Sequence, residues 1–413
     1  MQPEDLMLLT DFYEYTMAYA YFKENKHEEI AYFDMFVRTI PDGGGFLILN
    51  GLHRFIDFVQ NFHYTDAQID YLRQTGYFDE DFLHYLKTMT MDVDVWAIPE
   101  GTPVFANEPL VTIRGTLIQA QILETILLLC INYPTLTTTK AYRIVRASKG
   151  RAVLEFGSRR AHGFDAATEG ARGAYIAGCA GSACTIAGQK YAVPVSGTIA
   201  HSYVQLHDSE LEAFRSYARV SPDNCILLVD TYDTLHSGIP NAIKVAQEEL
   251  IPNGHRLKGI RIDSGDLAYL SKKARKMLDA AGLTDCKIVV SNSLDEFLID
   301  DLIMQDAKID TFGVGENMIT AKSTPVLGGV YKVVAHEKDG QIIPKIKISG
   351  NVEKLTNPGF KKIIRFYDKE NHQAIADLLA LRDEVIPTDE YLLFDPQAPW
   401  KQKRIKDYEM REL

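Results

Sequence analysis

The chain has 413 residues, of which 46% are hydrophobic and 24% charged, and its 44 Lys and Arg against 56 Asp and Glu give a net charge of −12. Such values are typical of a folded protein with about two or three domains, and they exclude a disordered or collagen-like chain. The negative charge opposes broad contact with nucleic acid or with an anionic membrane, but it is compatible with a local basic pocket for a small anion.

Cysteine usage and the apolar segments indicate a cytoplasmic protein. The five cysteines are odd in number and lack a CxxC pair, so we expect buried thiols instead of disulfides or a zinc site. Residues 1–5 are acidic and do not resemble a signal peptide. The most apolar stretch, residues 117–133, contains Gln119, Gln121 and Glu124, and is predicted to be too polar and too short to cross a membrane.

The first part of the chain, residues 1–115, mixes strand and helix signals. Asp42-Gly43-Gly44-Gly45 predicts a turn or loop between two strands. The elements expected in this part and directly after it are strands at 31–37 and 46–49, a helix at 66–87, short antiparallel strands within 91–113 and a long apolar helix at 117–129.

Between about residues 150 and 325, short β-branched runs alternate with helical segments. The runs expected to be strands are residues 152–156, 193–198, 225–230, 257–263, 287–291 and 309–314. Such a series requires parallel strands joined by crossover helices. Gly, Ser, Asp, Arg and His concentrate directly after these runs, which favours a (β/α) barrel with its active site at the carboxyl ends of the strands.

The last part of the chain is β-rich again, with a hairpin predicted at 330–336 and 341–348 around Lys338-Asp339-Gly340. Neither this part nor the first 115 residues is clearly self-sufficient. We therefore expect an N-terminal α/β domain at 1–115, a barrel at 116–325 and a C-terminal segment at 326–413 that packs with the N-terminal domain.

Three groups of residues after the predicted strands suit the binding of phosphates and a sugar. Gly313-Val314-Gly315 offers closely spaced backbone N–H groups to a phosphate, or forms a plain tight turn. Asp263 and Asp266 suit sugar hydroxyls, Mg²⁺ or a developing positive charge, with a helix N-cap as the alternative. Arg159 and Arg160 form a pair that suits phosphate or carboxylate.

Two further side chains are candidates for chemistry at the same end of the barrel. Arg261 is two residues before Asp263 and is expected on the same side of the strand, which favours a ligand over a simple salt bridge. His201 suits a general acid or base or a phosphoryl acceptor. The spacing of six residues to His207 places the two histidines on different faces of a helix, so a metal-binding pair is not expected.

Seven ordered motifs resemble those of the nicotinate phosphoribosyltransferase family. They are TDFYEYTM at 10–17; PEGTPVF at 99–105 with EPL at 108–110, TKA at 139–141 and Arg143; EFG at 155–157 with RRA at 159–161; GT at 197–198 with AH at 200–201; DSGD at 263–266; GVG at 313–315; and GGVYK at 328–332. The resemblance covers at least residues 8–365. Its specificity comes from the order of the motifs, since each is weak alone.

The resemblance implies the type II phosphoribosyltransferase fold, an irregular (β/α) barrel plus an α/β domain built from the N- and C-terminal segments. It implies transfer of phosphoribosyl from phosphoribosyl pyrophosphate to nicotinate, giving nicotinate mononucleotide and pyrophosphate in NAD biosynthesis by salvage. It also implies Mg²⁺, and ATP hydrolysis through a transiently phosphorylated His201. A homodimer with shared active sites is expected, without nucleic acid or membrane partners.

The family's roles transfer to individual positions of this chain. The resemblance assigns nicotinate contacts to Tyr13, Thr198 and Arg261, with Tyr13 acting on the partner subunit's site. Asp263 and Asp266 are expected to act with His201 in catalysis and are the candidates for Mg²⁺. Besides Arg159 and Arg160 as substrate-binding residues, the residues expected to bind phosphate are Ser264, Gly265, Ser291, Asn292, Gly313 and Gly315.

One departure and three alternatives stay open at this point. Glu316 follows the GVG loop where the family often has Thr, and a carboxylate there is unfavourable unless it binds Mg²⁺ or points away. The alternatives are a nicotinamide phosphoribosyltransferase of the same fold, a barrel lyase with a Schiff-base Lys190 or Lys244, and a non-catalytic nucleotide-binding relative. Neither lysine is at the carboxyl end of a predicted strand, and the GTxAH and DSGD contexts favour nicotinate over nicotinamide.

Overall fold

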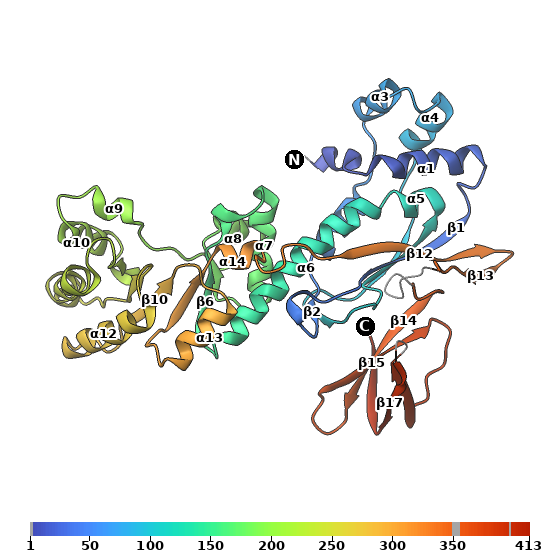
Figure 1. Ribbon diagram of the computed structural model, residues 1–413. Helices are drawn as coiled ribbons and strands as arrows, with labels where there is room; N and C mark the ends of the chain where they lie inside the picture. The colour runs from blue at the N-terminus through green and yellow to red at the C-terminus, as the bar shows by residue number, and fades with distance from the viewer. Residues whose placement is uncertain (1–2, 349–355, 396–397) are drawn as a thin grey trace. The chain divides into compact units, whose positions relative to one another are not determined.

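The computed structural model describes residues 3–348, 356–395 and 398–413, and the chain forms two compact units (Figure 1). Unit 1 comprises Met1–Asn132 with Leu327–Leu413, and unit 2 comprises Tyr133–Val326. The sequence analysis started the second domain at residue 116; the boundary is later because the helix after residue 116 packs on the first helix and on strands of unit 1. Residues 1 and 2, part of the acidic segment that argued against a signal peptide, lie outside the described residues.

Unit 1 is built around an antiparallel sheet in the order β13-β12-β1-β5-β3. Its centre is β1 (Ile30–Val37), which is buried along almost its whole length and pairs with β12 (Gly329–Lys338) from the other end of the chain. The one charged residue in β1, Asp34, is paired with Lys361 at 2.8 Å and accepts a hydrogen bond from Thr112. Both ends of the chain therefore contribute to one core.

The helices of unit 1 are α1 (Phe12–Lys23), α2 (Leu52–Gln60), α3 (Asp66–Gln74), α4 (Glu80–Thr88) and α5 (Leu117–Gln121). Its other strands are β2 (Leu47–Ile48), β3 (Asp94–Ala97), β4 (Pro103–Val104), β5 (Val111–Thr116), β13 (Gln341–Pro344), β14 (Lys361–Asp368), β15 (Ala374–Leu381), β16 (Glu390–Asp395), β17 (Ala398–Lys406) and β18 (Tyr408–Glu412). The helix predicted at 66–87 is two helices, because Gly76 adopts a left-handed φ of 72° and Asp79 caps a new helix start.

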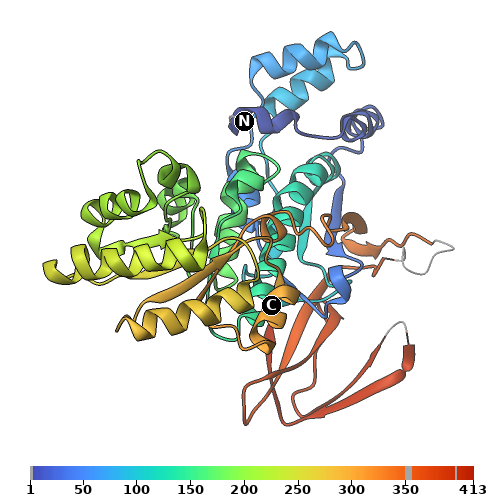
Figure 2. The same ribbon diagram turned by 60° about the vertical axis from the view of Figure 1, so that its left-hand side comes forward.

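Unit 2 is a parallel sheet in the order β7-β6-β11-β10-β9-β8, as a βα series requires. Its strands are β6 (Ala152–Glu155), β7 (Gly181–Ser182), β8 (Ile226–Leu228), β9 (Gly259–Ile262), β10 (Lys287–Ser291) and β11 (Thr311–Val314). Its helices include α6 (Glu124–Ala147, shared with unit 1), α7 (Phe164–Ile176), α8 (Thr185–Tyr191), α9 (His201–Gln205), α10 (Glu210–Val220), α11 (Ile239–Val245), α12 (Leu267–Ala280), α13 (Glu296–Met304) and α14 (Glu316–Ile319). Helices α12 and α13 run beside the sheet (Figure 2).

The predicted barrel is not closed by strand pairing between the two ends of the described strand series. In the part of the chain that the structure describes, the predicted strand at 193–198 forms one parallel bridge, from Val195 to Ser182, because Pro194, its second residue, has no N–H to donate. Among the described residues, no ladder joins this segment to β8 at the other end of the series. The two-residue strand β7 was not predicted, since it is too short to show a periodic pattern.

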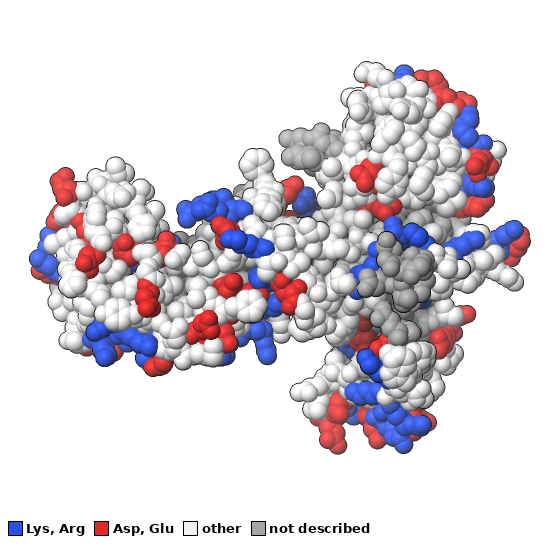
Figure 3. All heavy atoms as spheres, in the orientation of Figure 1, with Lys and Arg blue, Asp and Glu red and all other residues white. Residues whose placement is uncertain are grey.

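The apolar stretch at 117–133 is the start of a longer helical run. The run extends from Leu117 to Ala147 and is long and apolar enough to cross a membrane by length and composition alone, so the prediction that it is too polar and too short is wrong. Of the 18 most apolar consecutive residues in this run, 67% are buried within the fold, as in the core helix of a soluble protein. All five cysteines are buried and none forms a disulfide in the structure. Figure 3 shows acidic and basic side chains interspersed over the visible face.

Candidate active site

The carboxyl ends of β8, β9, β10 and β11 are adjacent in the sheet and bring together segments far apart in sequence. Leu228 of β8 is in register with Arg261 of β9, and Ser291 of β10 with Gly313 of β11. Because parallel strands end at the same edge, the polar residues that follow them meet there. This edge carries Arg261, Asp263 and Ser291, and Thr198 and His201 lie within contact distance of Arg261 and Asp263.

Arg261 is at the centre of this edge. Its Nε donates to Ser291 Oγ at 2.9 Å and its Nη1 to Thr198 Oγ1 at 3.1 Å. Its Nη2 is 3.3 Å from Asp263 Oδ1, and the guanidinium lies over the Phe156 ring at 5.6 Å. The side chain is only 16% exposed. A guanidinium fixed in this way, with an aromatic face beside it, suits a planar acid.

Phe156 was not selected from the sequence, although it directly follows β6. Its role depends on its contact with Arg261. That contact can be inferred only when the order of the strands in the sheet is known. Ser182 Oγ and the Gly157 N–H donate to the carboxylate of Glu155, the residue before Phe156. Burial raises the pKa of this Glu155 carboxyl. These bonds fix the end of β6 and hence the position of the ring.

His201 is the first residue of α9 and is 40% exposed through its side chain. Its Nδ1 is 3.1 Å from Thr231 Oγ1, so this nitrogen is held by a hydrogen bond. Its Nε2 is 4.0 Å from Asp230 Oδ1 and 3.9 Å from Asp263 Oδ2. One nitrogen is therefore fixed while the other faces two carboxylates, an arrangement suited to proton or phosphoryl transfer at Nε2.

Asp230, the last residue of the predicted strand at 225–230, is a second residue that the sequence analysis did not select. Its side chain is 1% exposed. Its Oδ2 accepts hydrogen bonds from the Asp263 N–H at 2.9 Å and from Ser264 Oγ at 2.5 Å. Its Oδ1 is buried and accepts no hydrogen bond from the described residues. Asp230 thus holds the turn after β9 and leaves one oxygen for a cation.

Asp266 acts as a helix N-cap, the alternative that the sequence analysis gave to a role in binding or catalysis. Its Oδ1 accepts from the Tyr269 N–H at 3.0 Å and caps α12. Gly265, with φ 78°, makes the turn that precedes this cap. The catalytic role of Asp266 and the phosphate contacts of Gly265 stay predictions.

Packing against Phe156 explains why the GVG loop has glycine at both positions. A Cβ on Gly313 would lie 2.6 Å from two carbons of the Phe156 ring, and one on Gly315 would lie 3.1 Å from the Phe156 carbonyl oxygen. Close approach to Phe156 therefore requires small residues here, whether or not a phosphate binds. Phosphate binding by Gly313 and Gly315 stays a prediction.

Replacing Gly313 by alanine is expected to lower the free energy of unfolding by about 1–3 kcal/mol, because the new methyl group overlaps the Phe156 ring. Chemical denaturation measures the change. Gly45→Ala is the matched control, since a Cβ there meets no atom within 4 Å. Equal stability of the two variants would contradict this account of the loop.

Arg159 and Arg160 are exposed in a 3-10 turn after β6. Arg160 Nε is 4.0 Å from a carboxylate oxygen of Glu316, and Lys322 Nζ is 2.7 Å from the other. The hydrogen bond from Lys322 lowers the pKa of Glu316. The carboxylate that departs from the family pattern is therefore neutralised by its own cations and does not repel a phosphate at full strength.

The loop after β10 is held in an unusual backbone conformation. Asn292 has φ 108° and Ser293 has φ 48°, and Asn317 Nδ2 donates to the Ser293 carbonyl at 2.8 Å. Non-glycine residues in such conformations cost about 1–3 kcal/mol each and cluster at ligand-binding loops. Asn292 stays a predicted phosphate-binding residue.

Tyr13 belongs to α1 in unit 1, whereas the other predicted site residues belong to unit 2. Burial and the nearby Glu124 carboxylate raise the pKa of its hydroxyl, so Tyr13 stays a protonated phenol. Among the described residues, no group of three or more His, Cys, Asp and Glu side chains is arranged to hold a metal ion. Mg²⁺ usually takes only one or two carboxylates and completes its shell with water and substrate phosphates, which Asp230 and Asp263 match.

Comparison with known proteins agrees with these motifs. The model of the nicotinate phosphoribosyltransferase N-terminal domain matches residues 8–132, and that of the C-terminal domain matches residues 360–413. The nicotinate phosphoribosyltransferase of Bacillus subtilis is 45% identical over 99% of this chain and 83% of its own length. The chain belongs to the nicotinate phosphoribosyltransferase family.

A more distant relative and two solved structures support the same family and fold. The human nicotinate phosphoribosyltransferase is 33% identical over 92% of this chain and 80% of its own length. The crystal structure of human nicotinic acid phosphoribosyltransferase superimposes with a TM-score of 0.84 at 29% identity, covering 98% of this chain and 89% of that one. The nicotinate-nucleotide pyrophosphorylase of Pyrococcus furiosus shares the fold, with a TM-score of 0.70 at 22% identity over 97% of this chain and 87% of that one. The predicted family and the type II phosphoribosyltransferase fold are confirmed.

Proposed function

We propose that this protein transfers phosphoribosyl from phosphoribosyl pyrophosphate to nicotinate, giving nicotinate mononucleotide and pyrophosphate in NAD salvage. The observation that supports it most directly is Arg261, a nearly buried cation held by Ser291 and Thr198 over the face of Phe156. A guanidinium pairs with the carboxylate of nicotinate and has no charge to pair with in nicotinamide. The aromatic ring offers a face to the pyridine.

The chemistry follows from the groups around Arg261. The pyridine nitrogen forms a bond to C1 of the ribose while the bond from C1 to the pyrophosphate oxygen breaks. Positive charge develops at C1, and the Asp263 carboxylate is placed to stabilise it. Arg159 and Arg160 attract the departing pyrophosphate. Asp230 and Asp263 would hold Mg²⁺ together with the substrate phosphates, and the bound ion would supply positive charge to the same leaving group.

ATP coupling is assigned to His201. With its proton on Nδ1, donated to Thr231 Oγ1, the ring presents an unprotonated Nε2 as the nucleophile. Nε2 takes the γ-phosphoryl group of ATP and releases ADP, and water later hydrolyses the phosphoramidate to inorganic phosphate. The phosphoryl group stands beside the carboxylates of Asp230 and Asp263. Its gain and loss therefore change the local charge and the affinity for the anionic substrate and product.

Pyrophosphate release by the purified protein tests the proposed function. The assay contains phosphoribosyl pyrophosphate and Mg²⁺ and compares nicotinate with nicotinamide, each with and without ATP. Turnover with nicotinate that ATP accelerates is expected. Turnover with nicotinamide alone would assign the sister activity, and no release with either substrate would support a non-catalytic relative.

We also propose a cytoplasmic homodimer in which Tyr13 completes the partner subunit's active site. Five buried, free thiols suit a reducing compartment. Tyr13 is 44% exposed on α1, so its ring is accessible for stacking on a pyridine bound to another chain.

Mixing two inactive variants tests the shared site. Tyr13→Ala and Arg261→Met subunits, denatured together and refolded, are expected to recover roughly a quarter of the wild-type activity, because random pairing makes half the dimers mixed and each mixed dimer has one intact site. Each variant refolded alone is the control. Activity that stays at the level of the single variants would mean that Tyr13 acts within its own chain.

A further inference from the structure

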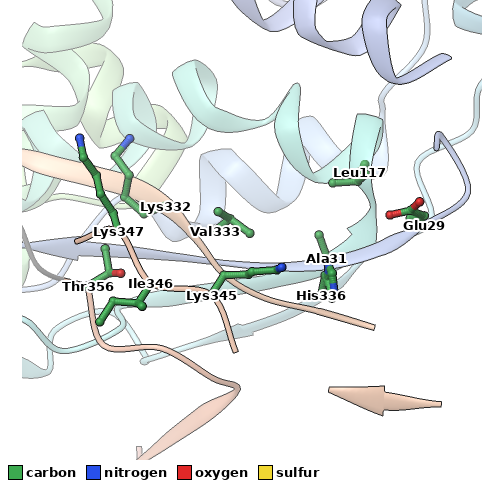
Figure 4. Close-up of a pocket in the computed structure, with 10 residues that line it drawn as sticks. All are labelled: Glu29, Ala31, Leu117, Lys332, Val333, His336, Lys345, Ile346, Lys347 and Thr356. Carbon is green, nitrogen blue, oxygen red and sulfur yellow. The ribbon is translucent and has the colours of Figure 1, made fainter. Parts of the chain in front are cut away.

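A buried lysine in α6 belongs to a motif that the proposed mechanism does not use. Lys140, of the TKA motif at 139–141, has a side chain that is only 3% exposed. A buried ammonium group loses its hydration, so folded proteins keep one only where it is paired and hydrogen-bonded. By contrast, Lys345 and Lys347 at a pocket of unit 1 are exposed, and their ammonium groups point to different ends of that pocket (Figure 4).

The ammonium group of Lys140 joins two segments of unit 2. Its Nζ donates to Glu296 Oε1 at 2.7 Å and to Ser323 Oγ at 2.9 Å. Glu296 is the first residue of α13, which follows the loop after β10. Ser323 follows the short helix α14, in the segment that begins with the GVG loop after β11. One buried cation therefore fixes the segments that continue from both loops with predicted phosphate contacts.

The same two segments are joined a second time, closer to the loops. Asn317 Nδ2 donates to the Ser293 carbonyl oxygen at 2.8 Å and is 3.2 Å from the Leu294 carbonyl oxygen. Ser293 has a φ of 48°, a conformation that a residue other than glycine keeps only where the surrounding structure fixes it. Asn317 and Lys140 together hold the segment after β10 against the segment after β11.

Helix α6 contacts the segment after β11 at one further point. The hydroxyl of Tyr133, about two helical turns before Lys140, is 2.8 Å from the Ile319 carbonyl oxygen. This segment also carries Glu316, whose carboxylate is 4.0 Å from Nε of Arg160. The position of the segment on α6 therefore affects a residue that is expected to bind substrate.

Lys140 also neutralises a carboxylate that is nearly buried. The Glu296 side chain is 11% exposed, and its Oε2 is buried and accepts no hydrogen bond from the described residues. Removing the lysine alone would leave this carboxylate without its counter-ion, which is strongly destabilising. The loss of the contact with Ser323 has to be measured separately from this electrostatic cost.

We propose that Lys140 is a positioning residue for the binding of phosphoribosyl pyrophosphate, since it fixes through Ser323 and Glu296 the segments that follow the two predicted phosphate-binding loops. This inference rests on the proposed function, because these loops matter only if they bind the phosphates of that substrate. Loosening the segments should weaken binding of phosphoribosyl pyrophosphate and leave that of nicotinate nearly unchanged, because Arg261 is on β9, outside both segments.

The variant Ser323→Ala tests the proposal, because it removes the hydrogen bond to the segment and keeps the ion pair with Glu296. Titration calorimetry with phosphoribosyl pyrophosphate and Mg²⁺, and kinetics with each substrate varied, are carried out on the purified full-length protein. We expect Kd and KM for phosphoribosyl pyrophosphate to rise about tenfold, and KM for nicotinate less than about twofold, because a hydrogen bond to a charged group is lost. Lys149→Gln is the matched control, since Lys149 pairs with Asp300 of the same helix α13 on the surface and should leave these constants unchanged.

The double variant Lys140→Met, Glu296→Gln removes the lysine together with the charge that it neutralises. Its thermal unfolding, followed by circular dichroism, should be closer to wild type than that of Lys140→Met, whereas both should bind phosphoribosyl pyrophosphate more weakly than wild type. The proposal is overturned if Ser323→Ala or the double variant binds this substrate as tightly as wild type, or if KM for nicotinate rises by the same factor.

The binding measurement keeps this inference distinguishable from the proposed function. Wild-type protein that binds phosphoribosyl pyrophosphate but releases no pyrophosphate would refute the proposed function alone, because the comparison of affinities still decides the role of Lys140. Wild-type protein that turns over nicotinate, with equal affinity for phosphoribosyl pyrophosphate in all variants, would refute the role of Lys140 alone. Absence of binding by the wild-type protein would overturn both.

Discussion

Replacing Arg261 by methionine is expected to lower kcat/KM for nicotinate by about 100- to 1,000-fold, since truncating one partner of a nearly buried charge pair costs about 2–5 kcal/mol. The side chain is 16% exposed and makes contacts with Ser291, Thr198 and Asp263. Methionine keeps the apolar contact with Phe156 but has no charge for the substrate carboxylate. Steady-state kinetics over a range of nicotinate concentrations measures the effect.

The comparison with nicotinamide distinguishes recognition of the acid from a merely structural role. Loss of charge recognition should reduce turnover of nicotinate much more than any turnover of nicotinamide. A fall by the same factor for both substrates would mean that Arg261 only positions the loops after β9 and β10. Arg256→Met is the matched control, since Arg256 is paired with Asp285 on the surface of the same unit and should be neutral for catalysis.

The fold was predictable from the sequence where a short apolar run is followed directly by turn residues. The apolar runs at 152–156, 225–230, 257–263, 287–291 and 309–314 each contain a strand, because every one is a short buried run followed by a turn. The run at 193–198 is also rich in β-branched residues but contains Pro194, and it forms a bridge instead of a strand. Pro194 was visible in the sequence and argued against a strand within the sheet at this position.

The site residues within the DSGD and GVG motifs were predictable from the sequence, whereas Phe156 and Asp230 were not. A strand followed by DSGD or by GVG marks the catalytic edge of a parallel sheet, so Asp263 and Gly313 could be selected from their positions alone. Phe156 and Asp230 could not, because their roles depend on neighbours from other strands. Phe156 matters through Arg261 of β9, and Asp230 through the backbone of Asp263. Which strands are adjacent is a property of the folded sheet.

The two missed residues change how the motifs are interpreted. DSGD contains two carboxylates, and the sequence treats them alike, whereas in the structure Asp263 faces His201 and Asp266 caps a helix. The second carboxylate beside His201 Nε2 comes from Asp230. The acidic pair that meets the histidine is therefore made by two neighbouring strands and not by one motif. A charge on His201 Nε2 therefore interacts with two carboxylates that follow different strands, β8 and β9.

Replacing His201 by asparagine is expected to abolish the stimulation of nicotinate turnover by ATP while leaving the rate without ATP within a few-fold of wild type. Asparagine keeps a polar group near Thr231 but has no nitrogen that can accept a phosphoryl group. Rates of pyrophosphate release with and without ATP measure the ratio. His236→Asn is the matched control, because its side chain is 85% exposed and is paired with Asp233, which caps the helical turn at Thr234–Gly238.

A direct label separates phosphorylation of His201 from an effect on ATP binding. Incubation with ATP carrying labelled γ-phosphate should label wild-type protein at a group that is labile in acid, as a phosphoramidate is, and should not label His201→Asn. Asp230→Asn is informative in the same assay. It retains the shape of the side chain and can still hold the Ser264 hydroxyl, but it removes one of the two charges that face Nε2. If His201→Asn keeps full stimulation by ATP, the phosphohistidine is not the coupling device, and ATP must act at another group on this edge of the sheet.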